Sequence, residues 1–392
     1  MLIFIKKAEE ISMKRVFIIG NASSIWMREY IREIHVKNGD RVWVTSFDSI
    51  GQNDFQMYNN MGVTVVELSK RGGIVGKLEK TYNLFRFAKR HLKGEEAFDW
   101  LEIQSPPISF QRKILFLMIL FLNCKVFTAF WGSDILAINE EQAKRLIPIL
   151  DKSIKINLPT TEMRNKFKYF YGSVYSNKIS ECNYGTLAFP HISRAKKELG
   201  RIECKEAFNL NKHKCSIAVG YNGKASQQHI KVINSLSNLC EYSKQQIELI
   251  VHMGYGTDKN REYYNKVKHS LMKSGIDYVI VDQMLPLESI GKLRVATDIF
   301  VHAQTTDALS GTIRECIFSE AILINPIWIR YQEYEKLGVD YIEYEQFDLL
   351  PEIIDDYLDG KYHIDTKRNA KLVSSVYSWD AVREDWLKVI NG

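Results

Sequence analysis

Short apolar runs separated by polar segments with helical spacing recur along the first half of the chain. Val16 to Ile19 is such a run; it ends at Gly20-Asn21, and apolar residues follow at helical spacing from Ile25 to Ile34. A buried strand of a parallel sheet produces a run of this kind, and a helix packed on that sheet produces the spacing after it. The same alternation predicts further strands at 42–44, 63–68, 99–104, 125–130 and 154–158.

The alternation breaks between residues 185 and 213, where charges are mixed and no apolar run stands out. It restarts with apolar runs at 215–219, 247–252, 278–281, 298–301 and 321–324. Two series of alternating strands and helices predict two doubly wound, Rossmann-like α/β domains, each binding ligands beyond the carboxyl ends of its strands. We predict an extension at 1–12, a first domain at 13–190, a linker at 191–213, a second domain at 214–376 and a terminal helix at 377–392.

The most informative segment carries Asp307 and Glu315, which stand eight positions apart. The run before them predicts a buried strand, and Ser310-Gly311-Thr312 opens an amphipathic helix. Free backbone N–H groups in the first turn of a helix, together with the helix dipole, favour an anion such as phosphate. Glu315, one turn into the helix, can reach a ribose diol, and Asp307 can reach a second polar group. The pattern suits a sugar nucleotide, although an acid near a helix start also stabilises the dipole without any ligand.

This segment resembles the acid-x7-acid signature of the GT-B glycosyltransferases, especially the family-4-like enzymes of bacterial surface-polysaccharide synthesis. The resemblance implies two Rossmann-like domains facing a cleft, with the terminal helix, 377–392, crossing back to the first domain. It also implies that Asp307 faces the donor sugar, that Ser310-Gly311-Thr312 holds the diphosphate and that Glu315 holds the ribose. Asp307 stands where the family has Glu, and Ser310 stands where it usually has Gly.

Three other segments are similar to donor-binding parts of the family. Lys224 resembles the basic residue that neutralises the donor diphosphate, where a cation also stabilises the leaving group. Gly20-Asn21 is similar to the opening loop, which faces the donor phosphates or the acceptor. Met284-Leu285 is similar to a loop that packs on the nucleotide base through backbone groups. Each also has a commoner explanation: a solvated lysine, the turn glycine of any doubly wound fold, and an ordinary apolar loop.

The segment TAFWGSDIL is similar to a strand and loop that relatives usually write with His-Gly-Ser-Asp. Trp131 stands in place of the His, so a histidine that is catalytic in relatives has no equivalent at this position. Asp134 remains, and the resemblance implies a contact with an acceptor hydroxyl or a role as catalytic base. The alternative for Asp134 is an N-cap of the next helix. We predict Asp307 and Asp134 as the catalytic residues.

Composition and cysteine content limit the class of protein and its cellular compartment. The chain has 392 residues, of which 45% are hydrophobic and 26% charged, as expected for two globular domains. Its six cysteines include no C-x-x-C pair, which argues against a zinc site and a secreted disulfide framework and favours the cytoplasm. No D-x-D motif and no cluster with metal-ligand spacing is present, so we expect neither a metal nor a cofactor. No stretch reaches the ~20 apolar residues of a membrane-spanning helix, and no signal peptide is visible.

Positive charge is concentrated between residues 70 and 94. Eight basic residues stand there against one acid, Glu79, whereas the whole chain has a net charge of +6. A basic amphipathic helix can lie on an anionic bilayer, which favours a peripheral position on the inner face of the cell membrane. Equally common is a helix whose apolar stripe packs on the sheet and whose basic back is solvated. No nucleic-acid-binding motif accompanies the charge.

The predicted function is a glycosyltransferase that moves a sugar from a nucleotide-sugar donor to a polysaccharide or lipid-linked saccharide acceptor. Two alternatives stay open. Another GT-B enzyme, such as a sugar-nucleotide epimerase, would require acid and base residues on both sides of the sugar. A non-catalytic nucleotide-sugar-binding module would require neither, because a fold alone does not establish an activity.

Overall fold

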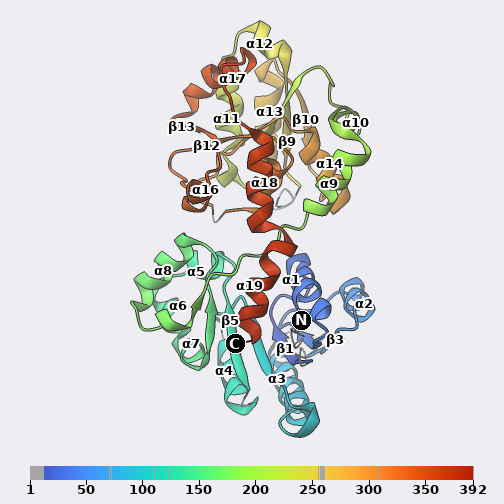
Figure 1. Cartoon of the computed structure of the whole chain (residues 1–392), viewed down its shortest axis with the longest axis vertical. Helices are drawn as coiled ribbons and strands as arrows, with labels where there is room; N and C mark the ends of the chain where they lie inside the picture. Colours follow the sequence, from blue (N-terminus) through green and yellow to red (C-terminus); the bar gives the residue numbers. More distant parts are fainter. Residues whose placement is uncertain are drawn as a thin grey trace, which may run out of the picture. The chain divides into compact units, whose positions relative to one another are not determined.

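The computed structural model describes residues 13–69, 71, 73–109, 111–122, 124–254, 256, 261–307 and 309–391 (Figure 1). The predicted extension at 1–12 and the basic residue Lys70 lie outside the described residues. The chain divides into two compact units. The first unit contains the residues up to Tyr184 and those from Val382 on, and the second contains Gly185–Ala381.

The first unit is built on a parallel sheet with the strand order β3-β2-β1-β4-β5-β6-β7. The central strand β4 is fully buried because helices cover both faces of the sheet and neighbouring strands cover both edges (Figure 1). The predicted strand at 63–68 shortens to two residues, and the equally short β7 escaped prediction. The strands are β1 (Arg15–Ile19), β2 (Arg41–Thr45), β3 (Thr64–Val65), β4 (Trp100–Gln104), β5 (Lys125–Ala129), β6 (Lys155–Asn157) and β7 (Ile179–Ser180).

The helices of the first unit pack apolar faces on this sheet. Leu84, Leu115 and Met118 from two of them join strand residues such as Phe17 and Leu101 in one core. The first helix continues into a π-helical turn, Ile31–His35. The helices are α1 (Ile25–Tyr30), α2 (Gln52–Asn60), α3 (Gly73–Arg90), α4 (Gln111–Leu122), α5 (Ser133–Leu136), α6 (Glu140–Lys144), α7 (Ile147–Lys152) and α8 (Thr161–Tyr171).

The second unit has its own parallel sheet, with the strand order β10-β9-β8-β11-β12-β13. The strands are β8 (Cys215–Val219), β9 (Ile247–His252), β10 (Asp277–Val281), β11 (Ile299–Val301), β12 (Ile322–Pro326) and β13 (Ile342–Tyr344). Its helices are α9 (Phe189–Glu198), α10 (Gly200–Glu206), α11 (His229–Leu236), α12 (Glu241–Gln246), α13 (Arg261–Ser274), α14 (Leu287–Ala296), α15 (Gly311–Phe318), α16 (Gln332–Leu337), α17 (Leu350–Leu358) and α18 (Thr366–Tyr377).

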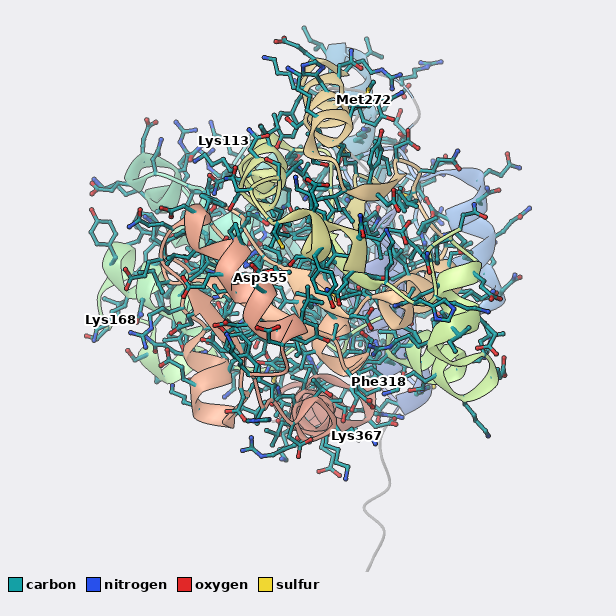
Figure 2. The ribbon with its side chains drawn as sticks, turned by 90° about the horizontal axis from the view of Figure 1, so that it is seen from above. Lys113, Lys168, Met272, Phe318, Asp355 and Lys367 are labelled. Carbon is teal, nitrogen blue, oxygen red and sulfur yellow. The ribbon has the colours of Figure 1, made fainter. Side chains whose placement is uncertain are left out.

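The segment expected to be a linker, 191–213, instead contains most of α9 and all of α10. Ile192, Ala195 and Cys204 of these helices are buried in the core of the second unit. Phe318 of α15, labelled in Figure 2, stacks on Phe189 of α9 with the ring centroids 4.1 Å apart. The apolar stripe of α9 and α10 is narrow and surrounded by charges, and for that reason the sequence pattern suggested a connection.

The last helix, α19 (Trp379–Asn391), passes from one unit to the other, because its residues from Val382 on belong to the first unit. Trp386 of α19 is fully buried there, and its indole Nε1 donates a hydrogen bond to the backbone oxygen of Asn183 at 2.7 Å. Its ring lies against Tyr30 and Tyr184, with centroids 4.9 and 5.2 Å away. The C-terminal segment therefore completes the core of the first unit.

Each sheet reverses its direction of growth at one point. In the first unit β1 and β4 are neighbours, with β2 on one side and β5 on the other. In the second unit β8 and β11 are neighbours in the same way. In doubly wound sheets ligands bind beyond the carboxyl ends of the two strands at such a switch point, because the following loops turn away on opposite sides.

Candidate functional site

In the second unit, the loops that follow β8 and β11 are joined at the switch point. The amide of Thr305 donates to the backbone oxygen of Ser226 at 3.0 Å. The side-chain amide of Gln228 donates to the backbone oxygen of Ala303 at 2.7 Å. These bonds hold the loop that carries Lys224 against the loop that carries the predicted acid and the helix start.

Asp307 is held in place by three donors. Its Oδ2 accepts hydrogen bonds from the amide of Ser310 at 2.8 Å and from the hydroxyl of Tyr331 at 2.7 Å. The hydroxyl of Tyr221 donates to Oδ1 at 3.2 Å. Burial and the neighbouring carboxylate raise the pKa of Tyr331 well above its usual value, so this hydroxyl remains a donor. Asp307 therefore shapes the turn before α15, and a donor sugar would share its carboxylate with two tyrosines.

The start of α15 has the features of an anion site. Ser310 is its N-cap, yet the hydroxyl is buried and has no hydrogen-bond partner among the described residues. The first turn of α15 carries no acidic side chain. Leu309, just before it, adopts a φ of +61°, a left-handed conformation that costs a residue with a side chain about 1–2 kcal/mol. Backbone strain of this kind concentrates where a ligand is bound.

Glu315 lies inside the second unit, and only 7% of its surface is exposed. Its Oε2 accepts a hydrogen bond from Nε of Arg294 in α14 at 3.0 Å, and Arg294 is 2% exposed. The same guanidinium donates to the hydroxyl of Thr312 at 3.3 Å. Arg294 thus connects the helix start to the predicted ribose-binding acid. This arginine was not predicted, because its only signal in the sequence is a basic residue among the apolar positions of α14.

The other predicted donor-binding residues of the second unit lie in the loops after β8 and β10. Lys224 is exposed, and its amide donates to the side-chain oxygen of Asn222 at 2.9 Å. Met284 is 77% exposed, whereas Leu285 is half-buried against the core. Lys224 and Met284 are therefore accessible to a ligand, and Leu285 anchors its loop.

Two buried histidines, His229 and His252, lie near the carboxyl ends of strands in the second unit. Burial lowers the pKa of His229 to about 4 and that of His252 to about 3, so both rings are neutral at pH 7. Gly220, at the end of β8, has a φ of +67°, and a Cβ at this position would lie 2.2 Å from Nε2 of His229. Only glycine fits there, because the imidazole packs directly against the backbone.

In the first unit, a pocket of about 150 Å³ lies at the switch point between β1 and β4. Gly20 permits its geometry, since a Cβ would stand 2.2 Å from Cε of Met27 and 2.8 Å from the backbone oxygen of Gln104. Ser105 has a φ of +60° at the end of β4. The pocket is lined by Asn21, Ser24, Met27, Gln104, Ser105 and Trp131.

The side chain of Asp134 is hydrogen-bonded to the backbone of the loop that carries Trp131. Its Oδ1 accepts hydrogen bonds from the amides of Trp131 at 3.0 Å and Gly132 at 2.8 Å, and Oδ2 lies 3.0 Å from the Trp131 amide. Burial raises the pKa of Asp134, while these bonds and one from the Ser105 hydroxyl oppose the rise. The hydrogen bonds of this carboxylate are therefore made to the loop that forms one side of the pocket. The predicted role as a base would require it to release one of these bonds.

We expect Asp134→Asn to keep activity within about tenfold of the wild type, because the amide oxygen still accepts the loop N–H groups. A general base contributes about 10²- to 10⁴-fold, so a larger loss would identify Asp134 as that base. The measurement is kcat with donor and acceptor saturating. Asp134→Ala is the comparison, since it removes both the loop bonds and the carboxylate.

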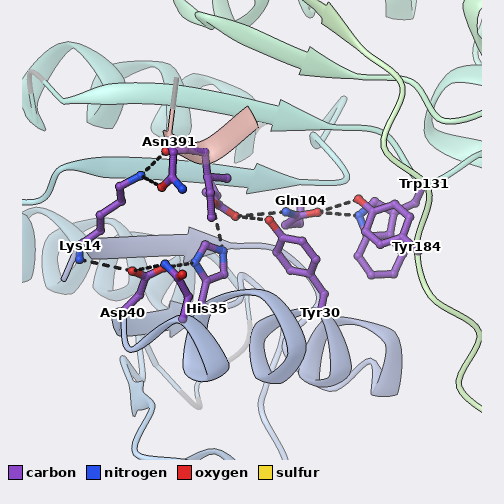
Figure 3. A network of polar contacts seen from close by, with 11 residues as sticks. Lys14, Tyr30, His35, Asp40, Gln104, Trp131, Tyr184 and Asn391 are labelled. Atoms are coloured by element: carbon purple, nitrogen blue, oxygen red, sulfur yellow. Dashed lines mark hydrogen bonds and ion pairs between the residues drawn. The ribbon is translucent and has the colours of Figure 1, made fainter. Parts of the chain in front are cut away.

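A buried polar network includes two of the residues that line this pocket, Gln104 and Trp131 (Figure 3). Glu102 of β4 is fully buried. It accepts hydrogen bonds from the hydroxyl of Tyr30 at 2.9 Å and from the side-chain amide of Gln104 at 3.3 Å. The side-chain oxygen of Gln104 accepts in turn from Nε1 of Trp131 at 2.9 Å and from the hydroxyl of Tyr184 at 3.1 Å. Two residues that line the pocket are thereby fixed to a buried carboxylate.

His35 lies at the far end of this network. Its Nδ1 is 2.9 Å from Oδ2 of Asp40, and its Nε2 is 3.2 Å from Oε1 of Glu102. Burial disfavours the imidazolium, but the two carboxylates outweigh burial and raise the pKa of His35 to about 9. This network was not predicted, because its only signal in the sequence is an acid inside the apolar run at 99–104.

No group of three or more His, Cys, Asp or Glu side chains within the described ranges is placed to hold a metal ion. Among the helices that the structure describes, none has the length and apolar character needed to cross a membrane.

No protein-family model matches the sequence, and no curated protein matches it significantly. Solved structures match nearly its whole length. HepE from Anabaena, in complex with UDP-glucose, is 12% identical, with a TM-score of 0.68 over 96% of this chain and 99% of HepE. A glycosyltransferase from Rickettsia africae is 14% identical, with a TM-score of 0.73 over 97% of this chain and 100% of that one. The lipopolysaccharide outer core galactosyltransferase WaaB is 10% identical, with a TM-score of 0.63 over 97% and 99%. The chain therefore has the two-domain GT-B fold, as the resemblance predicted.

Proposed function

We propose that this protein is a glycosyltransferase that moves a sugar from a nucleotide-sugar donor to a saccharide or lipid-linked acceptor of a bacterial surface glycan. One observation carries the proposal: most of the predicted ligand-binding residues follow the two strands at the switch point of their sheet, Gly20-Asn21 after β1 and Lys224 and Ser310-Gly311-Thr312 after β8 and β11. Proteins with this fold and near-complete overlap include HepE, solved with UDP-glucose, and WaaB, a lipopolysaccharide galactosyltransferase. These neighbours support transfer to a surface glycan over the epimerase and binding-module alternatives.

The donor diphosphate would rest on the first turn of α15 at Ser310-Gly311-Thr312, with Lys224 as its cation. Charge builds up on this diphosphate as the glycosidic bond breaks. A helix start and a nearby ammonium stabilise that charge, so the proposed reaction requires neither a metal nor a cofactor beyond the nucleotide sugar itself. Glu315, held by Arg294, would accept from the ribose, and Asp307, held by two tyrosines, would orient the sugar.

The acceptor would bind in the pocket of the first unit beside Asn21 and Ser105. Trp131, which replaces the expected histidine, forms one side of that pocket and donates its N–H to Gln104. An indole offers an apolar face on which a sugar ring can pack. Asp134 sets the position of that indole through the backbone of its loop. We place the enzyme in the cytoplasm, peripherally on the inner face of the membrane, because α3 carries a dense basic charge.

We expect Lys224→Ala to weaken donor binding by about tenfold or more, because a hydrogen bond to a charged group is worth about 1.5–3 kcal/mol. Donor binding is measured as a thermal shift with a panel of UDP-, GDP- and dTDP-sugars. Lys367→Ala is the matched control: this lysine is exposed on α18 (Figure 2) and lies outside the loops of the site.

With the best donor identified, release of nucleoside diphosphate is followed with and without a saccharide acceptor. Acceptor-dependent release is the expected result. A donor that changes its sugar without an acceptor would indicate an epimerase. Binding without any turnover would indicate a binding module, and no thermal shift with any donor would refute the proposal.

A further inference from the structure

Helices α3 and α4 of the first unit expose large apolar side chains to solvent. On α3, Leu78 is 67% exposed and Tyr82 is 66% exposed. On α4, Leu117 and Leu120 are each 51% exposed. Contiguous exposed apolar surface on a globular protein is typical of an interaction site. We name the following set the α3–α4 face: Ile74, Val75, Leu78, Tyr82, Leu117, Leu120 and Phe121.

The two apolar stripes form one surface. Phe85 of α3 and Phe121 of α4 are in edge-to-face contact, with ring centroids 5.5 Å apart. Phe85 follows Leu78 and Tyr82 on the same side of α3, since residues three or four apart are neighbours on a helix. Phe121 likewise adjoins Leu117 on α4. The ring contact therefore joins the exposed side chains of one helix to those of the other.

A pocket of about 430 Å³ opens where α3 and α4 begin. Arg71, Lys77 and Lys80 line it, against a single lining acid, Asp48. Gly73 and Gln111, the first residues of the two helices, also line it. Two helix starts and three basic side chains around one pocket favour an anion, because the helix dipoles and the basic groups both attract negative charge.

The cations of the pocket differ in how they are held. Arg71 forms an ion pair with Glu79 at 2.7 Å, and the ammonium of Lys80 donates to the backbone oxygen of Phe47 at 2.5 Å. The ammonium of Lys77 has no hydrogen-bond partner in the described part of the chain. A Cβ on Gly76 would lie 1.9 Å from the backbone oxygen of Arg71, so this glycine lets the Arg71 segment pack on α3. Lys77 is the cation left for a ligand.

We propose that the α3–α4 face docks on an anionic phospholipid bilayer, with its apolar side chains among the acyl chains and a lipid phosphate in the pocket at Lys77. Charge complementarity identifies this occupant. Ile74, Leu78 and Tyr82 lie on one side of α3, and the exposed Arg86 follows Tyr82 one turn later. An apolar surface bordered by a cation, next to a basic pocket large enough for a phosphate group, matches the layered chemistry of a bilayer surface. The inference rests on the peripheral location proposed above and specifies which surface produces it.

The test is co-sedimentation with vesicles of phosphatidylcholine, with and without an equal amount of phosphatidylglycerol. We expect binding only to the anionic vesicles. Lys77→Ala should weaken it roughly fivefold, the effect of removing one basic group near such a surface. Leu78→Ser and Tyr82→Ser should each weaken it by about tenfold or more, because each removes a side chain that is buried on docking.

Matched controls come from side chains of similar exposure elsewhere. Lys168→Ala on α8, Val174→Ser and Met272→Ser on α13 should bind as the wild type does; Lys168 and Met272 are labelled in Figure 2. Variants of the face that bind no worse than these controls would overturn the docking proposal. So would equal binding to neutral and anionic vesicles.

Two further measurements separate the possible failures. A Lys77→Ala variant that raises the KM for a lipid-linked acceptor but binds vesicles normally would assign the pocket to the acceptor phosphate and overturn docking. The thermal shift with the best nucleotide sugar is recorded for every variant and reports on the second unit alone. Vesicle binding without any donor-induced shift would refute the glycosyltransferase proposal and leave the docking surface intact.

Discussion

Glu315→Ala should both abolish measurable donor binding and lower the free energy of unfolding by about 3–5 kcal/mol. The alanine leaves the guanidinium of Arg294, which is 2% exposed, without its carboxylate. Removing one partner of a buried ion pair leaves an uncompensated charge in the interior, which costs far more than the pair contributes. Urea unfolding measures the stability, and the nucleotide-sugar thermal shift measures the binding.

A double variant separates these two effects. Glu315→Leu with Arg294→Met replaces the pair by apolar side chains of similar size, and such replacements are often neutral or stabilising. We expect it to recover most of the lost stability but no donor binding, because no carboxylate is left to accept from the ribose. Recovery of binding together with stability would show that Glu315 acts only through the fold and does not touch the donor.

The stability of the first unit should fall by about 3 kcal/mol as the pH rises from about 6.5 to above 9. His35 has a pKa of about 9 in the folded protein, although burial alone would lower it, because Glu102 and Asp40 favour the charged ring. An imidazole in the unfolded chain has a pKa of about 6.5. Protonation therefore favours the folded state. The stabilisation is complete below pH 6.5 and is lost as the pH passes through 9.

Urea unfolding at a series of pH values tests this expectation. His35→Gln should flatten the pH dependence, and His213→Gln, at an exposed position, should leave it as in the wild type. If the wild type and His35→Gln lose stability in parallel, His35 is not the titrating group. Because the network also fixes Gln104 and Trp131, we expect the acceptor KM to rise over the same pH interval while the donor thermal shift stays constant.

The apolar runs correctly located most of the strands. Val16 to Ile19 and 247–252 became β1 and β9 within one residue, because a strand buried on both faces requires a mainly apolar run. Two short strands escaped prediction: β7 and β13 hold two and three residues, too few for any periodicity. The helices α9 and α10 were mistaken for a linker, since a short helix with a narrow buried stripe resembles a polar connection.

The residues of the candidate site also differ in how far their positions could be predicted from the sequence. Gly20, Lys224 and the turn at Ser310-Gly311-Thr312 could be located from sequence, because each depends on its position relative to the end of a strand. The inward position of Glu315 could not. It depends on Arg294, which lies 21 positions earlier in the sequence on another helix. The chain also exposes Leu78 and Tyr82, which the sequence pattern could equally have placed against the sheet.

By itself, the sequence determined the order of most strands and helices, the two α/β units and the strand ends that carry polar residues, because these are properties of neighbouring positions. Only the tertiary structure decided which buried polar side chains form hydrogen bonds with one another. Tyr30 and Glu102 are 72 positions apart, and their hydrogen bond exists because β1 and β4 pair and α1 packs beside them. Buried polar side chains form hydrogen bonds with whichever segments the fold brings close to them, and the local sequence pattern does not specify those segments.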